Sequence, residues 1–464
     1  MKPLYLYVAT GLVVAGFGAT PLIVKYNIDK AFAEKKATLS SYGIALYETK
    51  NEGYLNNLRE IELKISDGKK FRDFVLDEIS KKEKSFALYA DKIKVETNRD
   101  IHKVLDGITF KGKVENSNLM LNNLKVSLSL TALSDEFMAQ MQKNEKLQKI
   151  FQPIFDEKLL TFYLDISPKE ELKQLTFKDI DTTFYGEKNL QTKLNINNHY
   201  FSFNSNDARI RGLYNIDNQQ IEVLDKNEIL KYKVGKLQYK FDYMGQFDQI
   251  GSFDINDIEL LSQRYKKNTS LHVKNFSISS NVVPRDKDTV SSSINYGVTG
   301  IDFQEGTSEF ALGNSNVNLN IDNMHTNSLL TLSKAYQKIY FQHEKGEKEF
   351  IAAMTTFINS GLKANIKADI KGLSFKNISL ADTSFTLDTT LSPNQFTIDK
   401  EFDTLLSSIA STGTLKVHKS DIQTLLSLNP SLEKILNLGK EEGEYLTYNT
   451  ELKNGNFTIN NQQF

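Results

Sequence analysis

The sequence predicts a mainly β fold with some α-helix (α+β), in which long curved antiparallel sheet and a few packing helices follow one N-terminal transmembrane helix. Apolar and polar residues alternate one by one in many segments, which is the pattern of a strand with one wet face. The chain also holds 29 Phe and 20 Tyr, which supply the bulky apolar side chains of a sheet core. An uncharged apolar run at the start of the chain predicts the helix.

This run spans residues 3–24, and its 22 residues form the predicted anchor. A helix of that length rises roughly 33 Å, which is enough to cross a hydrocarbon core of about 30 Å. Gly11, Ala15 and Ala19 recur every four residues within it and would let a second helix approach closely. Ordinary small residues in a membrane helix are the simpler interpretation of this spacing.

A cleaved signal peptide is the alternative to an anchor, but the small-residue cleavage positions are poor. Lys25, Lys30, Lys35 and Lys36 follow the run, so counting positive charges favours a cytoplasmic location for the body of the protein.

The composition excludes several classes of function. The chain has 57 Lys and Arg against 58 acidic residues, a net charge of -1, so no global field attracts nucleic acid. Because cysteine is absent, disulfides, thiolate nucleophiles, cysteine-ligated zinc and iron–sulfur clusters are excluded. We predict no cofactor and no nucleic-acid partner.

Strict alternation identifies the strands. In residues 124–132, Leu, Val and Ala at the even positions are separated by Lys, Ser and Thr. The same pattern recurs in residues 237–243, 317–321 and 364–370. Buried parallel strands would read as continuous apolar runs, so these segments predict antiparallel meanders.

Helical periodicity interrupts the strands in three regions. Residues 134–155 carry one apolar face with Ser134 as the expected N-cap, and a longer helix opens at Asn327 or Ser328, bends near Gly346 and ends at Gly361. Residues 401–438 predict further short helices. There, Ser420 and Gln423 match a capping box, and Pro430 restarts a helix that ends at Gly439.

These patterns divide the chain into four segments. Residues 1–24 are the transmembrane anchor, 25–45 a helical stalk that ends near Gly43, and 46–325 a β-rich region. Residues 326–464 form a C-terminal region of helices and strands with a terminal hairpin.

Two stretches carry a resemblance to a known family. Gly53-Tyr54-Leu55-Asn56-Asn57 lies between two predicted strands, and the chain ends with Lys453-Asn454-Gly455-Asn456-Phe457-Thr458-Ile459-Asn460-Asn461. Together with the anchor, these motifs resemble the bacterial YdgA-like family, also called domain of unknown function 945. The family's Gly-Trp-Phe-Ser-Ser-like turn lacks its Trp here, and Asn461 stands where the family has Gly. The resemblance implies an inner-membrane anchor with a β-rich periplasmic body, and it overrides the orientation from charges. It implies no catalytic residues.

Signatures of catalysis and metal binding are absent from the sequence. The six histidines lack the spacing of a metal-binding helix or finger. Ser431 and Lys434 match S-x-x-K, but the companion motifs of that chemistry are missing and a helix-start role explains Ser431. The acidic pairs Asp179 with Asp181 and Asp254 with Asp257 lie outside any calcium-binding loop motif. We therefore predict no catalytic, cofactor-binding or metal-ligating residues.

Three classes of function remain open. The first is binding of a lipid or another elongated hydrophobic ligand on an apolar sheet face, provided that the helices 134–155, 326–359 and 401–438 leave this face open. The second is an envelope scaffold or assembly protein that docks protein partners through strand edges or the anchor. A hydrolase is the third and least favoured class, because it would need residues distant in sequence to converge.

Overall fold

A computed structural model describes residues 36–52, 56–82, 87–117, 124–167, 172–186, 190–206, 209–226, 228–245, 247–264, 267–342, 346–376, 378–397 and 402–463. The chain divides into two compact units. Unit 1 comprises the residues up to Ser205 together with Gly212–Lys226, and unit 2 comprises Asn206–Arg211 and Asn227–Phe464. The four segments that the sequence patterns suggest, with boundaries at 24, 45 and 325, stay a prediction.

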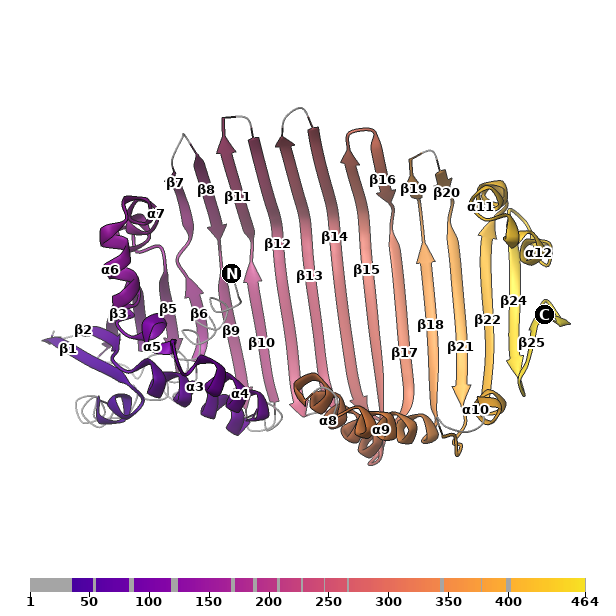
Figure 1. Ribbon diagram of the computed structural model, residues 1–464, viewed down its shortest axis with the longest axis horizontal. Helices are drawn as coiled ribbons and strands as arrows, with labels where there is room; N and C mark the ends of the chain where they lie inside the picture. The colour runs from indigo at the N-terminus through magenta and orange to yellow at the C-terminus, as the bar shows by residue number, and fades with distance from the viewer. Residues whose placement is uncertain are drawn as a thin grey trace. The chain divides into compact units, whose positions relative to one another are not determined.

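Unit 1 is built from strands and helices in alternation (Figure 1). Its elements are β1 (Ile44–Glu52), β2 (Asn56–Ile65), α3 (Gly68–Lys82), α4 (Ala87–Thr97), α5 (Ile101–Leu105), β3 (Thr109–Ser117), β4 (Leu124–Ala132), α6 (Asp135–Lys143), α7 (Glu145–Asp156), β5 (Thr161–Ile166), β6 (Leu172–Phe177), β7 (Ile180–Tyr185), β8 (Gln191–Asn197) and β11 (Asn218–Asp225). Strands β9 (Tyr200–Asn206) and β10 (Arg209–Ile216) run across the boundary between the units.

Every strand pair of unit 1 for which a register is established is antiparallel, as the alternation predicts. Strands β1 to β6 pair in sequence order, β6 pairs with β9, and β8 pairs with both β7 and β11. In β4, Leu124, Val126, Leu128 and Leu130 are all buried. They belong to a core that includes residues of α3, α5, α6 and α7, so these helices cover one face of the sheet.

The predicted helix 134–155 is two helices, α6 and α7. Ser134 is the N-cap of α6, as expected, and its hydroxyl accepts the backbone N–H of Phe137 at 3.3 Å. The break lies at Asn144, whose extended backbone ends α6 and whose side-chain Oδ1 accepts the backbone N–H of Leu147 in α7. An asparagine that caps the next helix therefore interrupts a continuous apolar periodicity.

Unit 2 contains the longest strands of the described chain. Its elements are β12 (Glu228–Gly245), β13 (Asp248–Arg264), β14 (Lys267–Pro284), β15 (Thr289–Glu305), β16 (Ser308–Leu312), β17 (Ser315–His325), α8 (Thr326–Gln342), α9 (Glu347–Asn359), β18 (Leu362–Ile370), β19 (Leu373–Phe375), β20 (Ile378–Leu380), β21 (Thr383–Leu391), α10 (Phe402–Ser408), β22 (Ile409–His418), the 3₁₀ turn η5 (Lys419–Asp421), α11 (Ile422–Leu428), the 3₁₀ turn η6 (Pro430–Leu432), α12 (Glu433–Leu436), β23 (Lys440–Glu442), β24 (Tyr445–Lys453), β25 (Asn456–Ile459) and β26 (Gln462–Gln463).

The strands of unit 2 form one antiparallel series. Neighbours in its main path are β12, β13, β14, β15, β17, β18, β21, β22 and β24, with shorter strands beside them. Figure 1 shows that α8, α9 and α10 lie near one end of these strands and that α11 and α12 lie near the other end. Among the described residues of unit 2, no helix crosses the middle of the long strands.

The helices of unit 2 differ from the prediction in detail. The long helix begins at Thr326 and divides into α8 and α9, and Gly361 follows α9 with a φ of 78°. Ile409 begins β22 instead of continuing α10. The capping-box prediction is wrong, because the hydroxyl of Ser420 contacts His418 and Asp421, and α11 begins after Asp421 without a side-chain cap.

The terminal hairpin is confirmed. Strands β24 and β25 pair with Lys453 opposite Asn456, which leaves Asn454 and Gly455 as the two-residue turn. Their φ angles are 49° and 78°, the left-handed values that a tight hairpin turn requires and that Asn and Gly tolerate best. Of the N-terminal resemblance motif, Gly53, Tyr54 and Leu55 lie outside the described residues, whereas Asn56 and Asn57 begin β2, which pairs with β1.

The predicted anchor, residues 1–24, lies outside the described residues, as does most of the stalk. Residues 36–41 are helical, and Gly43 with a φ of 77° precedes β1. No helix in the described part of the chain has both the length and the hydropathy to span a membrane.

Candidate functional site

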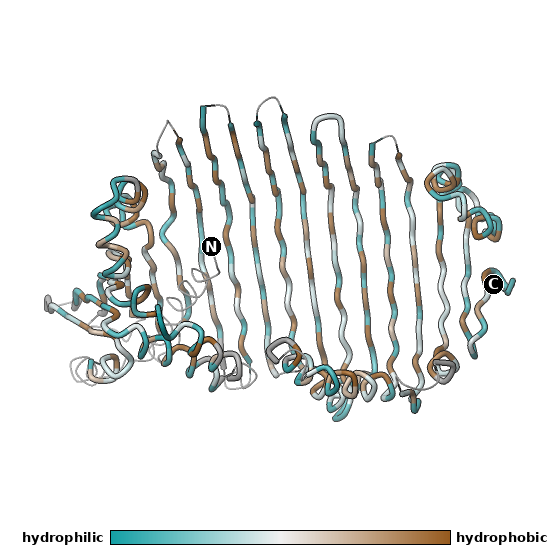
Figure 2. Tube along the Cα trace, in the orientation of Figure 1, coloured by the Kyte–Doolittle hydropathy of each residue, from teal (hydrophilic) through white to brown (hydrophobic). Residues whose placement is uncertain are grey.

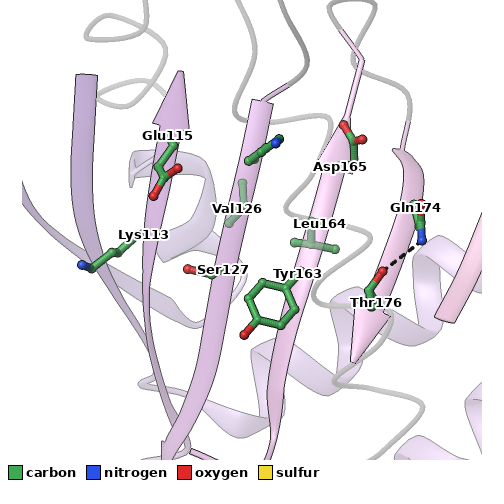
Figure 3. Close-up of a pocket in the computed structure, with 10 residues that line it drawn as sticks. Lys113, Glu115, Val126, Ser127, Tyr163, Leu164, Asp165, Gln174 and Thr176 are labelled. Carbon is green, nitrogen blue, oxygen red and sulfur yellow. Dashed lines mark hydrogen bonds between the residues drawn. The ribbon is translucent and has the colours of Figure 1, made fainter. Parts of the chain in front are cut away.

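One face of the sheet in unit 1 carries a shallow hollow with a volume of about 390 Å³. Strands β3, β4, β5 and β6 lie side by side there and contribute pairs of outward-facing residues (Figure 3). The lining comprises Lys113, Glu115, Lys125, Val126, Ser127, Tyr163, Leu164, Asp165, Gln174 and Thr176. The residues between these outward positions, such as Val114, Val126 and Leu164, are buried in the core of unit 1. A packed core therefore supports the floor of the hollow.

Two rows of polar side chains cross this hollow. Cross-strand pairing aligns Lys113, Ser127, Tyr163 and Thr176 in one row. It aligns Glu115, Lys125, Asp165 and Gln174 in the next row. Two lysines and two carboxylates thus share the surface, and their formal charges cancel.

The second candidate surface is the apolar face of unit 2, defined by a row of side chains that crosses seven neighbouring strands. Residues directly opposite each other in paired strands share a face of the sheet. The pairing sets in one row Tyr239, Phe253, Ile278, Tyr296, Val317, Ala368 and Phe385. Six strand intervals of about 4.8 Å give this row a length of roughly 29 Å.

Flanking rows extend the apolar face. On one side lie Leu237, Ile255, Phe276 and Val298. On the other side lie Phe241, Gly251, Ser280, Ile294, Leu319, Ile366 and Leu387. None of the residues in the three rows is charged. Figure 2 shows the alternation of hydrophobic and hydrophilic residues along these strands.

Solvent reaches the apolar face. The exposed fractions are 40% for Tyr239, 42% for Tyr296 and 37% for Val317. Ser280 is also exposed, and the other members of the rows are half-buried, because each packs against neighbours in its own sheet without a covering layer. The helices predicted at 326–359 and 401–438 lie near the ends of the strands of unit 2, so among the described residues they leave this face uncovered (Figure 1).

The opposite face of the same strands is predominantly polar. Side chains there include Lys240, Asp242, Ser252, Asp254, Ser279, Asn295, Asn318, Asn320, Asn365, Lys367 and Asp388. Some of them form amide ladders across strands, in which Asn320 Nδ2 donates to Asn365 Oδ1 and Asn365 Nδ2 donates to Asp388 Oδ1. The sheet therefore offers solvent two chemically distinct faces.

A partly buried histidine lies in unit 1. The ring of His199 stacks on Phe177 with a centroid distance of 3.9 Å, and Tyr214 approaches its edge. Its Nε2 is buried and has no hydrogen-bond partner. Burial in this aromatic environment lowers the pKa of His199 to about 4, because the charged imidazolium loses hydration.

A second histidine, His418, belongs to a polar cluster at the end of β22. Its Nδ1 lies 2.7 Å from the Ser420 hydroxyl, and its Nε2 lies 3.3 Å from Glu444 Oε2. The Ser420 hydroxyl also lies 2.9 Å from Asp421 Oδ1, and the backbone N–H of Ser420 points to His418 Nδ1. These contacts cap the start of η5, so the cluster has a local structural role. Sequence spacing gave no indication of it.

The other residues that the sequence analysis considered as site candidates do not come together in one site among the described residues. Gly11, Ala15 and Ala19 lie outside the described residues. Ser431 is the second residue of η6, after Pro430, and Asn429 Oδ1 accepts both its backbone N–H and its hydroxyl, which agrees with a helix-start role.

One residue of each acidic pair is explained by its place in the backbone structure. Asp179 Oδ1 accepts the backbone N–H of Asn198 at 2.7 Å, and Asp257 occupies an irregular point of β13 with a φ of 52°. Within the described ranges, no group of three or more His, Asp or Glu side chains could hold a metal ion.

Comparison with known proteins identifies the family but no characterised relative. No curated protein and no solved structure matches the chain. A family model described as "Bacterial protein of unknown function (DUF945)" matches residues 107–434. This region covers most of the chain and includes β3–β6 as well as the long strands of unit 2. The chain is therefore a member of the bacterial domain of unknown function 945 family.

Proposed function

We propose that this protein acts by binding, and that its ligand is an elongated hydrophobic molecule such as a lipid chain, which lies on the apolar face of unit 2. The observation that carries the proposal is the row from Tyr239 to Phe385, which is uncharged, partly exposed and free of a covering helix among the described residues. Large exposed apolar surfaces on soluble parts of proteins are typical of interaction sites.

The shape of the surface favours an extended ligand. Three hollows along the described strands are widely open to solvent, so a compact molecule bound in one of them would remain partly in water. A chain laid across the strands instead contacts every member of a row roughly 29 Å long. When the ligand chain and the apolar face cover each other, both lose contact with water, and this burial contributes about 25 cal/mol per Å² of apolar area to the binding free energy.

The chemistry of the surroundings favours a lipid over other apolar ligands. The uncharged run at residues 3–24 has the length of a membrane span, so we propose that it holds the body at the bacterial inner membrane, on the periplasmic side. A protein tethered in this way meets bilayer lipid at high local concentration. The alternative is a scaffold whose apolar face docks an envelope protein.

Site-specific photo-crosslinking in cells distinguishes these functions. A photoreactive phenylalanine analogue replaces Val317 on the apolar face in the full-length protein. The matched control replaces Asn316, the adjacent exposed residue on the opposite face. We expect a lipid adduct, identified by mass spectrometry, at position 317 and none at 316. Adducts only with other proteins would favour the scaffold, and equal lipid labelling at both positions would contradict the proposal.

A further inference from the structure

The hollow on β3–β6 in unit 1 has a chemistry unlike that of the apolar face of unit 2. From this chemistry we infer that it is a binding site for a neutral saccharide. The inference rests on an exposed aromatic ring surrounded by small hydroxyl side chains, on a balanced set of charged groups, and on a carboxylate oxygen without a partner. It is independent of the lipid proposal, because it concerns different strands and a different class of ligand.

The ring of Tyr163 is the aromatic surface on which a sugar ring would stack, and we call it the aromatic platform. Its side chain projects from β5 with 46% of its surface exposed, although it lies in the middle of the hollow. Its cross-strand neighbours on the same face are Ser127 on β4 and Thr176 on β6, both of which are small (Figure 3). The ring is therefore accessible at its face as well as at its edge. An accessible aromatic face packs well against the flat C–H surface of a sugar ring, since each partner loses apolar area to water.

Hydrogen-bonding groups surround this platform on two sides. Gln174 Nε2 donates to Thr176 Oγ1 at 3.1 Å, which fixes the amide and leaves its carbonyl oxygen as an acceptor. Asp165 Oδ1 is shielded from solvent and has no hydrogen-bond partner. An unsatisfied acceptor of this kind is costly, and a ligand hydroxyl that reaches it after a small rotation of the carboxylate would remove the cost.

The balance of positive and negative side chains in the hollow disfavours ligands that carry a net charge. Lys113 and Lys125 face the same hollow as Glu115 and Asp165, so the four formal charges cancel. A phosphate, a nucleotide or an anionic lipid headgroup would meet two carboxylates, and a simple cation would meet two ammonium groups. A neutral polyol instead accepts hydrogen bonds from the lysines and donates to the carboxylates. Together with the aromatic platform, this requirement identifies a sugar ring.

The openness of the hollow indicates how much of a glycan it holds. Its volume of about 390 Å³ lies at the lower end of ordinary ligand sites, and it is open to solvent along the sheet. One or two sugar units fill it, and further units of an oligosaccharide extend over the surface.

The test uses the purified full-length protein in a detergent without a sugar headgroup, applied to an array of neutral and anionic oligosaccharides. We expect binding to at least one neutral glycan. We expect at least tenfold weaker binding for Tyr163→Ala, retained binding for Tyr163→Phe, and weaker binding for Asp165→Asn. The matched control is Tyr185→Ala, which removes an exposed tyrosine of β7 in the same unit and leaves the hollow intact.

Two results would overturn the inference. One is the absence of any neutral glycan that binds the wild-type protein better than the Tyr163→Ala variant. The other is a preference for anionic glycans that depends on Lys113 and Lys125 and not on Tyr163. Because Tyr163→Phe and Asp165→Asn preserve size and shape, they test the inference even if Tyr163→Ala fails to fold. Neither result bears on lipid labelling at position 317.

Discussion

Replacement of His199 tests whether an aromatic environment in unit 1 keeps this ring neutral. The ordinary pKa of histidine, 6.5, applies to the unfolded chain, whereas the pKa in the folded protein is about 4. Between pH 6.5 and pH 4 the imidazole is therefore protonated in the unfolded state and neutral in the folded state. The free energy of unfolding of the protein falls as the pH decreases through this range. Above pH 6.5 both states hold a neutral ring, and the effect disappears.

The magnitude follows from the difference of 6.5 and 4, which is about 2.5 pKa units. At 1.36 kcal/mol per unit this gives an upper limit of about 3 kcal/mol. Partial solvent contact of the ring reduces the expected effect to about 2 kcal/mol at pH 4.5, the lowest pH of the assay. The variant His199→Phe keeps the stack on Phe177 and removes the titration.

The assay is urea unfolding followed by tyrosine fluorescence at several values between pH 7.5 and pH 4.5, for the wild-type protein and His199→Phe. Carboxylates also titrate in this range, but they do so in both proteins, so the difference between the two curves isolates His199. We expect the variant to gain stability relative to wild type as the pH falls below 6.5. If the free energies of unfolding of the two proteins differ by the same amount at every pH, the reasoning is refuted. If the wild-type protein gains stability relative to the variant as the pH falls, the pKa of His199 is raised in the folded protein and not lowered.

Further substitutions at three positions test local packing, the first two positions by the change in thermal or urea unfolding midpoint and the third by soluble expression. Tyr448→Phe removes a hydroxyl that donates to the backbone carbonyl of Leu436 at 3.0 Å in a buried site, so we expect a loss of about 1–2 kcal/mol; an unchanged midpoint would contradict this. Ser134→Ala removes the N-cap of α6 and should cost about 1 kcal/mol, whereas Ser134→Asp should retain most of the stability. Gly112→Ala places a Cβ 1.8 Å from the backbone oxygen of Ser127, so we expect β3 and β4 to separate and soluble expression to fall sharply; a normally folded variant would contradict the close approach of these strands.

The resemblance to a family, the antiparallel class and many individual strands could be predicted from the sequence. Alternation identified β4 with its observed bounds, 124–132, because a side-chain period of two survives wherever one face is apolar and the other is wet. The Asn-Gly turn of the terminal hairpin was also predictable, since few residues accept its backbone angles. Family membership rested on short terminal motifs, and the match over residues 107–434 confirms it.

The candidate sites were much less predictable. Nothing in the sequence distinguishes Tyr163 from other tyrosines of strands, because its exposure depends on the small size of Ser127 and Thr176 in neighbouring strands. The contacts of His418 with Ser420 and Glu444 were missed for a similar reason, since β24 brings Glu444 close only after the strands pair.

By itself, the sequence determined that this protein is a β-rich chain with apolar and polar faces on its strands, and with no cysteine chemistry. Only the tertiary structure decided which faces are covered. In unit 1, helices α3, α5, α6 and α7 bury the apolar face in a core, whereas in unit 2 the described helices lie at the strand ends and the apolar rows remain accessible. The physical reason is that periodicity records which side of a strand is apolar, but the layer that packs against this side is chosen by contacts between segments distant in the chain.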